Sequence, residues 1–280
     1  MVSERLFVQL QHLLPKRLIT RLLGFFARRR GGALTQWAIR RFIARYNVNL
    51  AEAMQTEPGA YATFNDFFTR ALRPGARPLA TARLVCPVDG AISQFGRIEH
   101  DQIFQAKGKS FSSSALLAGN EERARQFDDG LFATLYLSPR DYHRIHMPCD
   151  GRLISMRYVP GELYSVNPAT ARAVDALFAR NERVVCDFDS PHGPFALVLV
   201  GAAIVGSIAT AWHGVVNPPR SRSVRHWDYR DRHITLKQGE EMGRFLLGST
   251  VVLLFPQGPL QFNPDWAPTR AVHLGEAMAD

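Results

Sequence analysis

The longest apolar run of this chain, residues 195–208, limits the folds that are open to it. Gly201, Gly206 and Ser207 interrupt the run, and its many valines favour an extended backbone. A helix that crosses a bilayer needs about 18 or more consecutive apolar residues. The run is therefore predicted to form two buried strands, and no transmembrane span is expected.

Most of the chain after Leu84 has a similar texture, in which short β-type runs alternate with glycine-rich turns. With 280 residues, 46% of them hydrophobic, the chain can bury a full core. We predict an α+β fold with a mainly antiparallel sheet core, either barrel-like or a sandwich, with short helices. The expected strands are residues 91–98, 131–137, 151–159, 183–188, 195–200, 203–209 and 250–255, and the expected helices are residues 63–70, 113–118, 121–127 and 169–179.

The first 50 residues differ from the rest in charge. They hold ten basic residues and one acidic residue, so their net charge of +9 equals that of the whole chain. Apolar residues recur there at helical spacing in three segments, which Pro15 and the pair Gly31 and Gly32 separate. Basic amphipathic helices of this kind lie in the interface of anionic membranes, where each basic residue contributes about 1 kcal/mol.

We therefore predict two parts, an N-terminal helical membrane-binding appendage over residues 1–50 and an α+β domain over residues 51–280. The alternative for the appendage is a helical pair packed on the domain with its basic face in water. Nucleic acid is not expected as a partner, because the body of the chain has no basic stripe with interleaved aromatic residues.

The cysteines and the N-terminus indicate the compartment. Cys86, Cys149 and Cys186 are odd in number and lack CxxC spacing, which favours buried, reduced thiols. Pro15 and the arginines break any signal-peptide core. We expect a peripheral protein on the cytoplasmic face of the cell membrane.

Leu247-Gly248-Ser249-Thr250 stands directly before the last long apolar run. A serine held at a tight strand entry can attack the preceding carbonyl and form an ester. β-Elimination and hydrolysis then leave a pyruvoyl group at a new amino terminus and release ammonia. Glycine suits the preceding position, because it has no Cβ to block the attack. The plainer interpretation is a small turn before a strand.

Two segments far upstream supply an aspartate and two histidines: CPVDGAIS at residues 86–93 and SPRDYHRIHMP at residues 138–148. Together with residues 247–250, they closely resemble the phosphatidylserine decarboxylases of bacteria, which are pyruvoyl enzymes made as self-cleaving proenzymes. Residues 159–167, 177–183 and 205–208 fit the same family. The likeness runs from about Leu6 to about Gly258.

The resemblance implies that Asp89, His146 and Ser249 form a self-processing triad and that Gly248–Ser249 is the bond cut. It implies a β chain of residues 1–248 and an α chain of residues 249–280, paired as a heterodimer that could dimerise further. The cofactor would be the covalent pyruvoyl group made from Ser249. It would form a Schiff base with phosphatidylserine in an anionic membrane, and the product would be phosphatidylethanolamine.

The residue types suit that chemistry. Serine becomes a nucleophile when a base takes its proton, and an aspartate behind His146 would fix the tautomer of that base. His143 is our candidate proton donor to the carbanion that loss of CO2 leaves, since imidazole titrates near neutral pH. We expect no metal site, because no third ligand stands at a recognisable spacing from the two histidines.

Two other functions compete with this hypothesis. Ser249 could be the standing nucleophile of a Ser-His-Asp hydrolase, although Thr250 and Val251 take the place of a G-x-S-x-G elbow. A membrane-surface scaffold built on the basic helices is the second competitor, and it leaves the three motifs unexplained. Asp89 could also be a turn residue that accepts backbone N–H groups.

Overall fold

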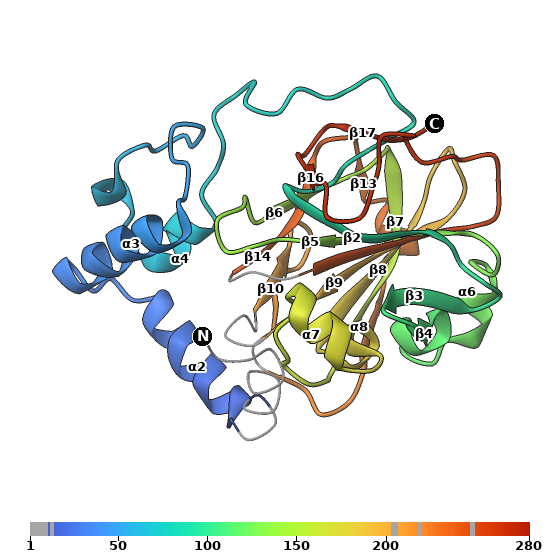
Figure 1. Ribbon diagram of the computed structural model, residues 1–280, viewed down its shortest axis with the longest axis horizontal. Helices are drawn as coiled ribbons and strands as arrows, with labels where there is room; N and C mark the ends of the chain where they lie inside the picture. The colour runs from blue at the N-terminus through green and yellow to red at the C-terminus, as the bar shows by residue number, and fades with distance from the viewer. Residues whose placement is uncertain (1–10, 12–13, 203–206, 218–219, 247–249) are drawn as a thin grey trace.

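The computed structural model of this chain describes Gln11 and residues 14–202, 207–217, 220–246 and 250–280, and its centre is a nine-stranded antiparallel sheet (Figure 1). The strands lie in the order β12-β7-β8-β9-β15-β5-β2-β16, and β13 also pairs with β7. Their bounds are β2 (Gly90–Arg97), β5 (Leu131–Tyr136), β7 (Gly151–Val159), β8 (Arg183–Asp189), β9 (Phe195–Val200), β12 (Arg225–Asp228), β13 (Thr235–Leu236), β15 (Thr250–Phe255) and β16 (Ala271–Val272).

A second sheet, with the order β11-β10-β14-β6, packs on one face of the first. It consists of β6 (Arg144–His146), β10 (Ile208–Thr210), β11 (Gly214–Asn217) and β14 (Glu241–Phe245). Two smaller sheets complete the strands. One pairs β1 (Leu84–Val85) with β17 (Ala277–Ala279), and the other pairs β3 (Gln102–Ala106) with β4 (Lys109–Ser112).

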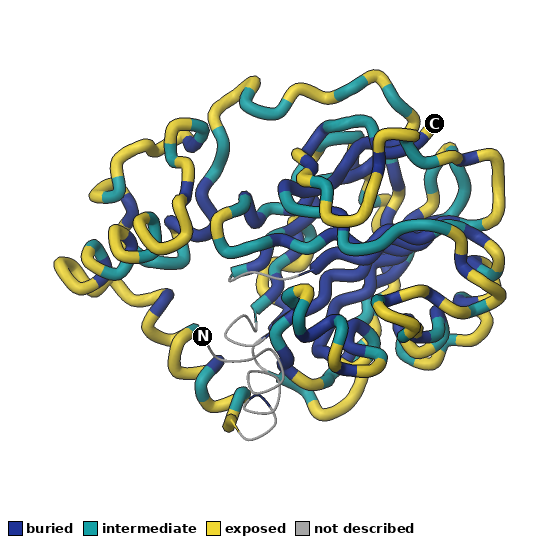
Figure 2. Tube along the Cα trace, viewed as in Figure 1, coloured by how far each residue is buried: buried dark blue, intermediate teal, exposed yellow. Residues whose placement is uncertain are grey.

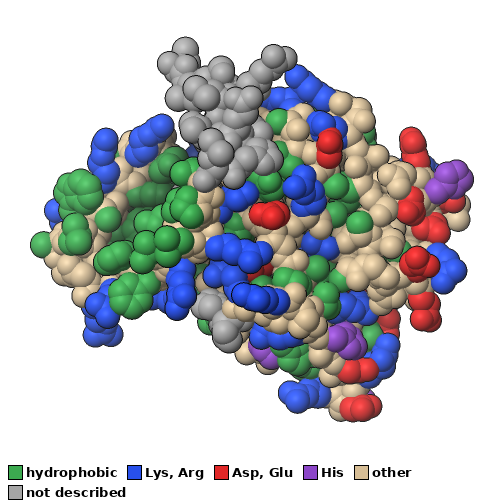
Figure 3. Space-filling view, turned by 90° about the horizontal axis from the view of Figure 1, so that it is seen from below, with side chains coloured by type: hydrophobic (Ala, Val, Ile, Leu, Met, Phe, Trp, Pro, Cys, Tyr) green, Lys and Arg blue, Asp and Glu red, His purple; other side chains and the backbone are tan. Residues whose placement is uncertain are grey.

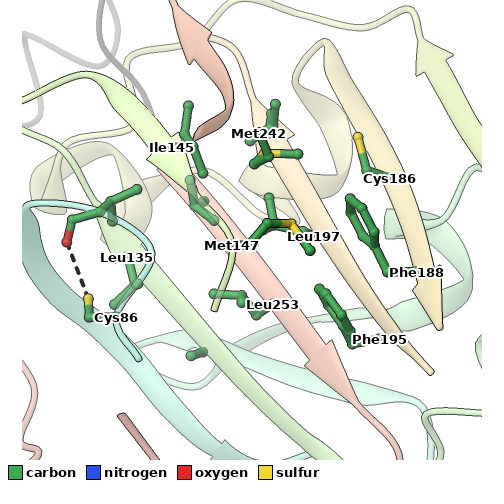
Figure 4. Close-up of a cluster of buried hydrophobic side chains, with 14 of the residues drawn as sticks. Cys86, Leu135, Ile145, Met147, Cys186, Phe188, Phe195, Leu197, Met242 and Leu253 are labelled. Carbon is green, nitrogen blue, oxygen red and sulfur yellow. Dashed lines mark hydrogen bonds between the residues drawn. The ribbon is translucent and has the colours of Figure 1, made fainter. Parts of the chain in front are cut away.

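The main sheet is buried on both faces. Along β15, Val251 and Leu253 enter the core shared with the second sheet, whereas Val252 and Leu254 enter a core on the opposite face. Strands that are covered on both sides need apolar residues at every position, which explains the unbroken runs in the sequence. Figure 4 shows the first core, where Cys86 donates a hydrogen bond to the carbonyl of Val88 at 3.2 Å.

Short helices cover the opposite face of the main sheet (Figure 1). They are α5 (Ser113–Leu116), α6 (Glu121–Arg125), α7 (Pro168–Ala173) and α8 (Leu177–Arg180), and two 3₁₀ turns lie elsewhere, η1 (Pro58–Ala60) and η2 (Arg230–Arg232). Ser112, Asn120 and Asn167 cap the first turns of α5, α6 and α7.

The N-terminal helices stand beside this body and are more exposed than it is (Figure 2). They are α2 (Lys16–Ala27), α3 (Ala33–Tyr46) and α4 (Phe64–Phe68). Thr63 caps α4 in a capping box with Asp66. The small apolar cluster of α3 and α4 includes Ile39 and Phe67 and is separate from both cores of the body.

The predicted α+β class is confirmed, and its sandwich form is the correct one, because the described strands do not close into a barrel. Six of the seven predicted strands match within one or two residues. For the seventh, residues 203–206 lie outside the described residues, and β10 begins at Ile208. The helix predicted over residues 169–179 is instead two helices, because Val174 is extended and Ala176 is left-handed. No helix in the described part of the chain is both long and apolar enough to cross a bilayer.

Candidate active site

Asp89 lies in the bend that leads into β2, and it is 6% exposed. Its carboxylate accepts hydrogen bonds from Arg77 Nε at 2.9 Å and Nη2 at 2.6 Å, and from the Leu274 backbone N–H at 2.9 Å. Arg77 also bonds Glu52, at 2.7 Å. The two carboxylates raise the pKa of the Arg77 guanidinium, so its charge is fixed and it neutralises part of theirs.

His146 ends β6 with both ring nitrogens engaged. Nδ1 lies 2.7 Å from the Gly239 carbonyl oxygen, and Nε2 lies 3.0 Å from the Tyr142 hydroxyl. A carbonyl can only accept, so Nδ1 carries the proton, and Nε2 holds the lone pair to which Tyr142 donates. Burial lowers the pKa of His146, against the opposing effects of Gly239, Glu241 and Asp89, which favours the neutral ring.

The expected contact between Asp89 and His146 is therefore not formed. No hydrogen bond among the described residues joins the Asp89 carboxylate to the His146 imidazole. The Gly239 carbonyl fixes the tautomer of His146, a role that the sequence predicts for Asp89. The two segments still meet through the backbone, where the His146 N–H donates to the Pro87 carbonyl at 2.9 Å. That the triad acts in processing stays a prediction.

His143 is fully buried beneath Phe68, with 4.1 Å between the ring centroids. Its Nδ1 donates to the Asp141 carbonyl at 2.8 Å, and its Nε2 has no hydrogen-bond partner among the described residues. Burial lowers the pKa of His143 to about 3, so the ring is neutral near pH 7 and the proton that it carries is held by a carbonyl.

Gly248 and Ser249 lie outside the described residues, but the chain on either side of them is placed. Before them, β14 pairs with β6, where Glu241 is opposite His146, and the Phe245 N–H donates to the His143 carbonyl at 3.0 Å. After them, Thr250 opens β15 opposite Tyr136 of β5. The predicted cleavage site thus joins a strand beside both histidines to the central strand of the main sheet.

A cavity of about 710 Å³ opens at this end of the sheet. Its walls include Asp89, Ala91, Tyr136 and Tyr142, together with α7 residues such as Ala171. In the sheet, Tyr136 pairs with Ala91 on one side and with Thr250 on the other. The cavity therefore lies close to Thr250, the first residue of β15. This volume falls in the range of small-molecule sites.

The cavity is lined by more basic than acidic side chains. The basic ones are Arg70, Arg77, Lys107, Arg140 and Arg172, and the acidic ones are Glu52, Asp89 and Asp141. Because Arg77 already pairs with Glu52 and Asp89, the arrangement suits a ligand that brings negative charge.

Three residues of this site were not singled out from the sequence. Tyr142 stands in the motif that carries both histidines, so its place in that motif could have identified it as a site residue. Gly239 has a φ of +80°, and the only trace of its role in the sequence is a glycine before β14. Arg77 gave no signal, because a loop arginine is ordinarily solvated.

Comparison with known proteins gives full-length matches. A family model described as phosphatidylserine decarboxylase matches residues 64–280, and one described as PSD matches residues 6–47. A phosphatidylserine decarboxylase proenzyme of Chromobacterium violaceum is 68% identical over 279 residues, which are 99% of this chain and 100% of that protein. Proteins of the same name from Polaromonas naphthalenivorans and Methylibium petroleiphilum are 66% and 67% identical, over 100% and 99% of this chain and 98% of each relative.

Proposed function

This chain belongs to the phosphatidylserine decarboxylase family, and we propose that it is a proenzyme which cuts itself at Gly248–Ser249 and then converts phosphatidylserine to phosphatidylethanolamine. The observation that carries the proposal is the identity of 66–68% with proenzymes of that name over nearly the whole chain. A second support is the cavity beside the histidine motif, since the family likeness and the geometry select the same end of the sheet.

For self-processing we assign His146 as the base that takes the hydroxyl proton of Ser249. A neutral imidazole with its proton on Nδ1 has the lone pair on Nε2 that this step requires. Asp89 acts less directly in our proposal. Its carboxylate contributes negative charge near His146, and its bonds to Arg77 and Leu274 hold the entry of β2 in place.

The prosthetic group that we propose is a pyruvoyl group derived from Ser249, which supplies an electron sink when it is bound to an amine substrate. The described surroundings fit a small polar group. Thr250, the next residue, has a fully buried hydroxyl oxygen without a hydrogen-bond partner in the part of the chain that the structure describes, and the cavity wall begins on the neighbouring strand. Lys16, Lys107, Lys109 and Lys237 all lie outside recognisable cofactor motifs, which makes a lysine-bound cofactor the weaker choice.

The substrate headgroup fits the charge of the cavity. A serine phospholipid presents a phosphodiester and a carboxylate, both anionic, and the cavity wall has five basic and three acidic side chains. Arg140 is exposed, and its guanidinium lies 3.7 Å from Asp141, so it is free to reorient toward a bound anion.

We assign residues 1–50 to the membrane surface and residues 51–280 to catalysis. Helix α2 faces the protein with Thr20 and Ala27, which are buried, while its leucines and phenylalanines are 40–61% exposed. A helix packed on the domain would have the opposite orientation, so this observation favours the membrane over the packed pair. Figure 3 shows hydrophobic side chains gathered on one part of the surface and flanked by Lys and Arg. The exposed large hydrophobic residues of α2 and α3 are Leu18, Leu22, Leu23, Phe25, Phe26, Leu34, Trp37 and Tyr46.

The remaining assignments follow from these. The partners are phosphatidylserine in an anionic membrane and the two chains of the cut protein, residues 1–248 and 249–280. We place the protein as a peripheral protein on the cytoplasmic face, because that leaflet carries the anionic lipids that basic helices bind.

Intact mass under denaturing conditions tests self-processing. The wild type should give two chains, the smaller starting with a pyruvoyl group and ending at Asp280, and Ser249→Ala should give one chain. An active wild type that stays uncut would favour the hydrolase. Borohydride trapping with substrate should label only the smaller chain, and label on a lysine would contradict the pyruvoyl assignment.

A further inference from the structure

We propose that Tyr142 is the proton donor of the decarboxylation, fed by His146. The inference rests on the proposed function and changes the donor from His143 to its neighbour. Loss of CO2 leaves an electron pair on the substrate carbon, and one proton must reach that carbon in each turnover. The donor must face the substrate and must be able to recover its proton.

Position separates the two candidates. Tyr142 lines the cavity, whereas the cavity wall does not include His143, whose ring is fully buried beneath Phe68. The only N–H of the neutral His143 ring is bonded to the Asp141 carbonyl, and its other ring nitrogen carries no proton. His143 would have to be charged to donate from the free nitrogen, and its burial opposes that charge.

Tyr142 meets the chemical requirement as well. Burial raises the pKa of its phenol, so the hydroxyl keeps its proton throughout the neutral range. That hydroxyl lies 3.0 Å from His146 Nε2, and the two rings lie 5.7 Å apart between centroids. The tyrosine thus links the cavity to an imidazole, and hydroxyl rotation directs its proton toward either one.

The proton count closes through His146, which is partly exposed, while Tyr142 is 5% exposed. The O–H bond of Tyr142 breaks as a C–H bond forms on the substrate carbon. The resulting phenolate takes a proton from His146 Nε2, which has gained one from water, and the imidazole returns to its neutral form. Each turnover consumes one proton from solvent and releases one CO2, with no oxidant or reductant.

Stereochemistry in D2O provides a test that a structural role would not affect. A fixed side-chain donor delivers to one face, so wild-type enzyme should make phosphatidylethanolamine with one deuteron on the carbon next to nitrogen, in a single configuration. Processed Tyr142→Phe should lose turnover by about 10²- to 10⁴-fold and give both configurations. His143→Gln is the matched control, and it should keep the single configuration.

Three results would overturn the assignment. They are a processed Tyr142→Phe enzyme with the wild-type rate, slow Tyr142→Phe turnover that keeps a single configuration, or mixing of configuration in His143→Gln alone.

If Tyr142→Phe is recovered uncut, 3-fluorotyrosine placed at position 142 keeps the hydroxyl and lowers the pKa of the phenol. Its turnover should then shift in rate and pH dependence, and an unchanged profile would also overturn the assignment. Wild-type protein that makes no phosphatidylethanolamine would instead reject the proposed function.

Discussion

At the scale of single residues, one backbone carbonyl determines what His146 can do. Gly239 holds the proton on Nδ1, so Nε2 keeps a lone pair, which rotation of the Tyr142 hydroxyl frees without rearrangement of the ring. Because burial lowers the pKa of His146 below its ordinary value near 6.5, the neutral form persists as the pH falls. If His146 is the base, as we propose, it is lost only when the pH falls through that lowered pKa.

We therefore expect self-processing to keep most of its rate from about pH 8 to about pH 6.5 and to slow only below that range. Protein made by cell-free translation can be shifted to buffers of different pH and the loss of uncut chain followed by mass spectrometry. Cleavage that is already half-maximal at or above pH 6.5 would contradict the assignment of a neutral, buried His146 as the base.

The ion pair of Asp89 and Arg77 gives a second prediction at this scale. Their side chains are 9% and 11% exposed, so Arg77→Gln leaves a buried carboxylate without its cation. Removing one partner of such a pair costs about 3–5 kcal/mol in the free energy of unfolding. Urea denaturation of the uncut Ser249→Ala protein, with and without Arg77→Gln, measures the loss.

Arg230→Gln is the control for that experiment. Arg230 pairs with Asp228 at 2.6 Å, but the two side chains are 63% and 50% exposed, and exposed pairs contribute at most about 1 kcal/mol. If Arg77→Gln and Arg230→Gln lower the free energy of unfolding equally, the Asp89–Arg77 pair stabilises the fold no more than an exposed pair does.

At the scale of elements, β14 connects the proposed cleavage site to the histidines. It lies between β10 and β6, and a Cβ added at Gly243 would be 2.5 Å from the Ala209 carbonyl oxygen. Gly243→Ala should force these strands apart, cost about 1–3 kcal/mol and slow processing, because β6 carries His146. Gly59→Ala is the control, since no described atom beyond its chain neighbours lies within 4 Å of its added Cβ and its φ needs no glycine. Unchanged processing and unfolding free energy in Gly243→Ala would contradict this reasoning.

The sequence predicted the long elements and missed the short ones for a physical reason. A strand such as β15 is buried on both faces and leaves an apolar run, whereas β6 and β11 have three and four residues and too little pattern to detect. The second sheet is made of strands of three to five residues, and of these only β10 overlaps a predicted strand, residues 203–209. Consequently the sequence identified the histidine motif but not the carbonyl of Gly239, whose contact with His146 depends on the pairing of β14 with β6.

At the scale of the whole molecule, one segment of the chain, residues 161–173, contacts the exposed helix α2 at one end and lines the cavity at the other. Lys16, at the start of α2, lies 3.6 Å from Glu162 and 3.4 Å from the ring centroid of Tyr164, and Arg17 donates to the Gly161 carbonyl at 3.3 Å. The same stretch of chain continues into α7, which lines the cavity. A membrane that receives α2 would therefore lie near the segment that bounds the cavity, where a lipid headgroup must enter.

The last prediction tests that arrangement with Leu22→Asp and Phe26→Asp combined. These side chains are 50% and 61% exposed and make no part of the buried cores, so the fold should survive. Burying one such side chain fully in the membrane contributes about 1.5–3 kcal/mol to the free energy of membrane binding. The aspartates that replace them carry negative charge, which anionic lipid repels. We expect at least about tenfold weaker flotation with phosphatidylserine vesicles and lower activity on them, with little change on a short-chain soluble analogue.

Val224→Asp is the matched control, because Val224 is 47% exposed and lies on the body rather than on α2. Raising the salt concentration should weaken vesicle binding of the wild type, since the arginines of the appendage act through screened charge. Removing residues 1–30 should act in the same direction as the double substitution. If the double variant is folded and floats as well as the wild type, the membrane must contact another face, and the outward leucines and phenylalanines of α2 need a different explanation.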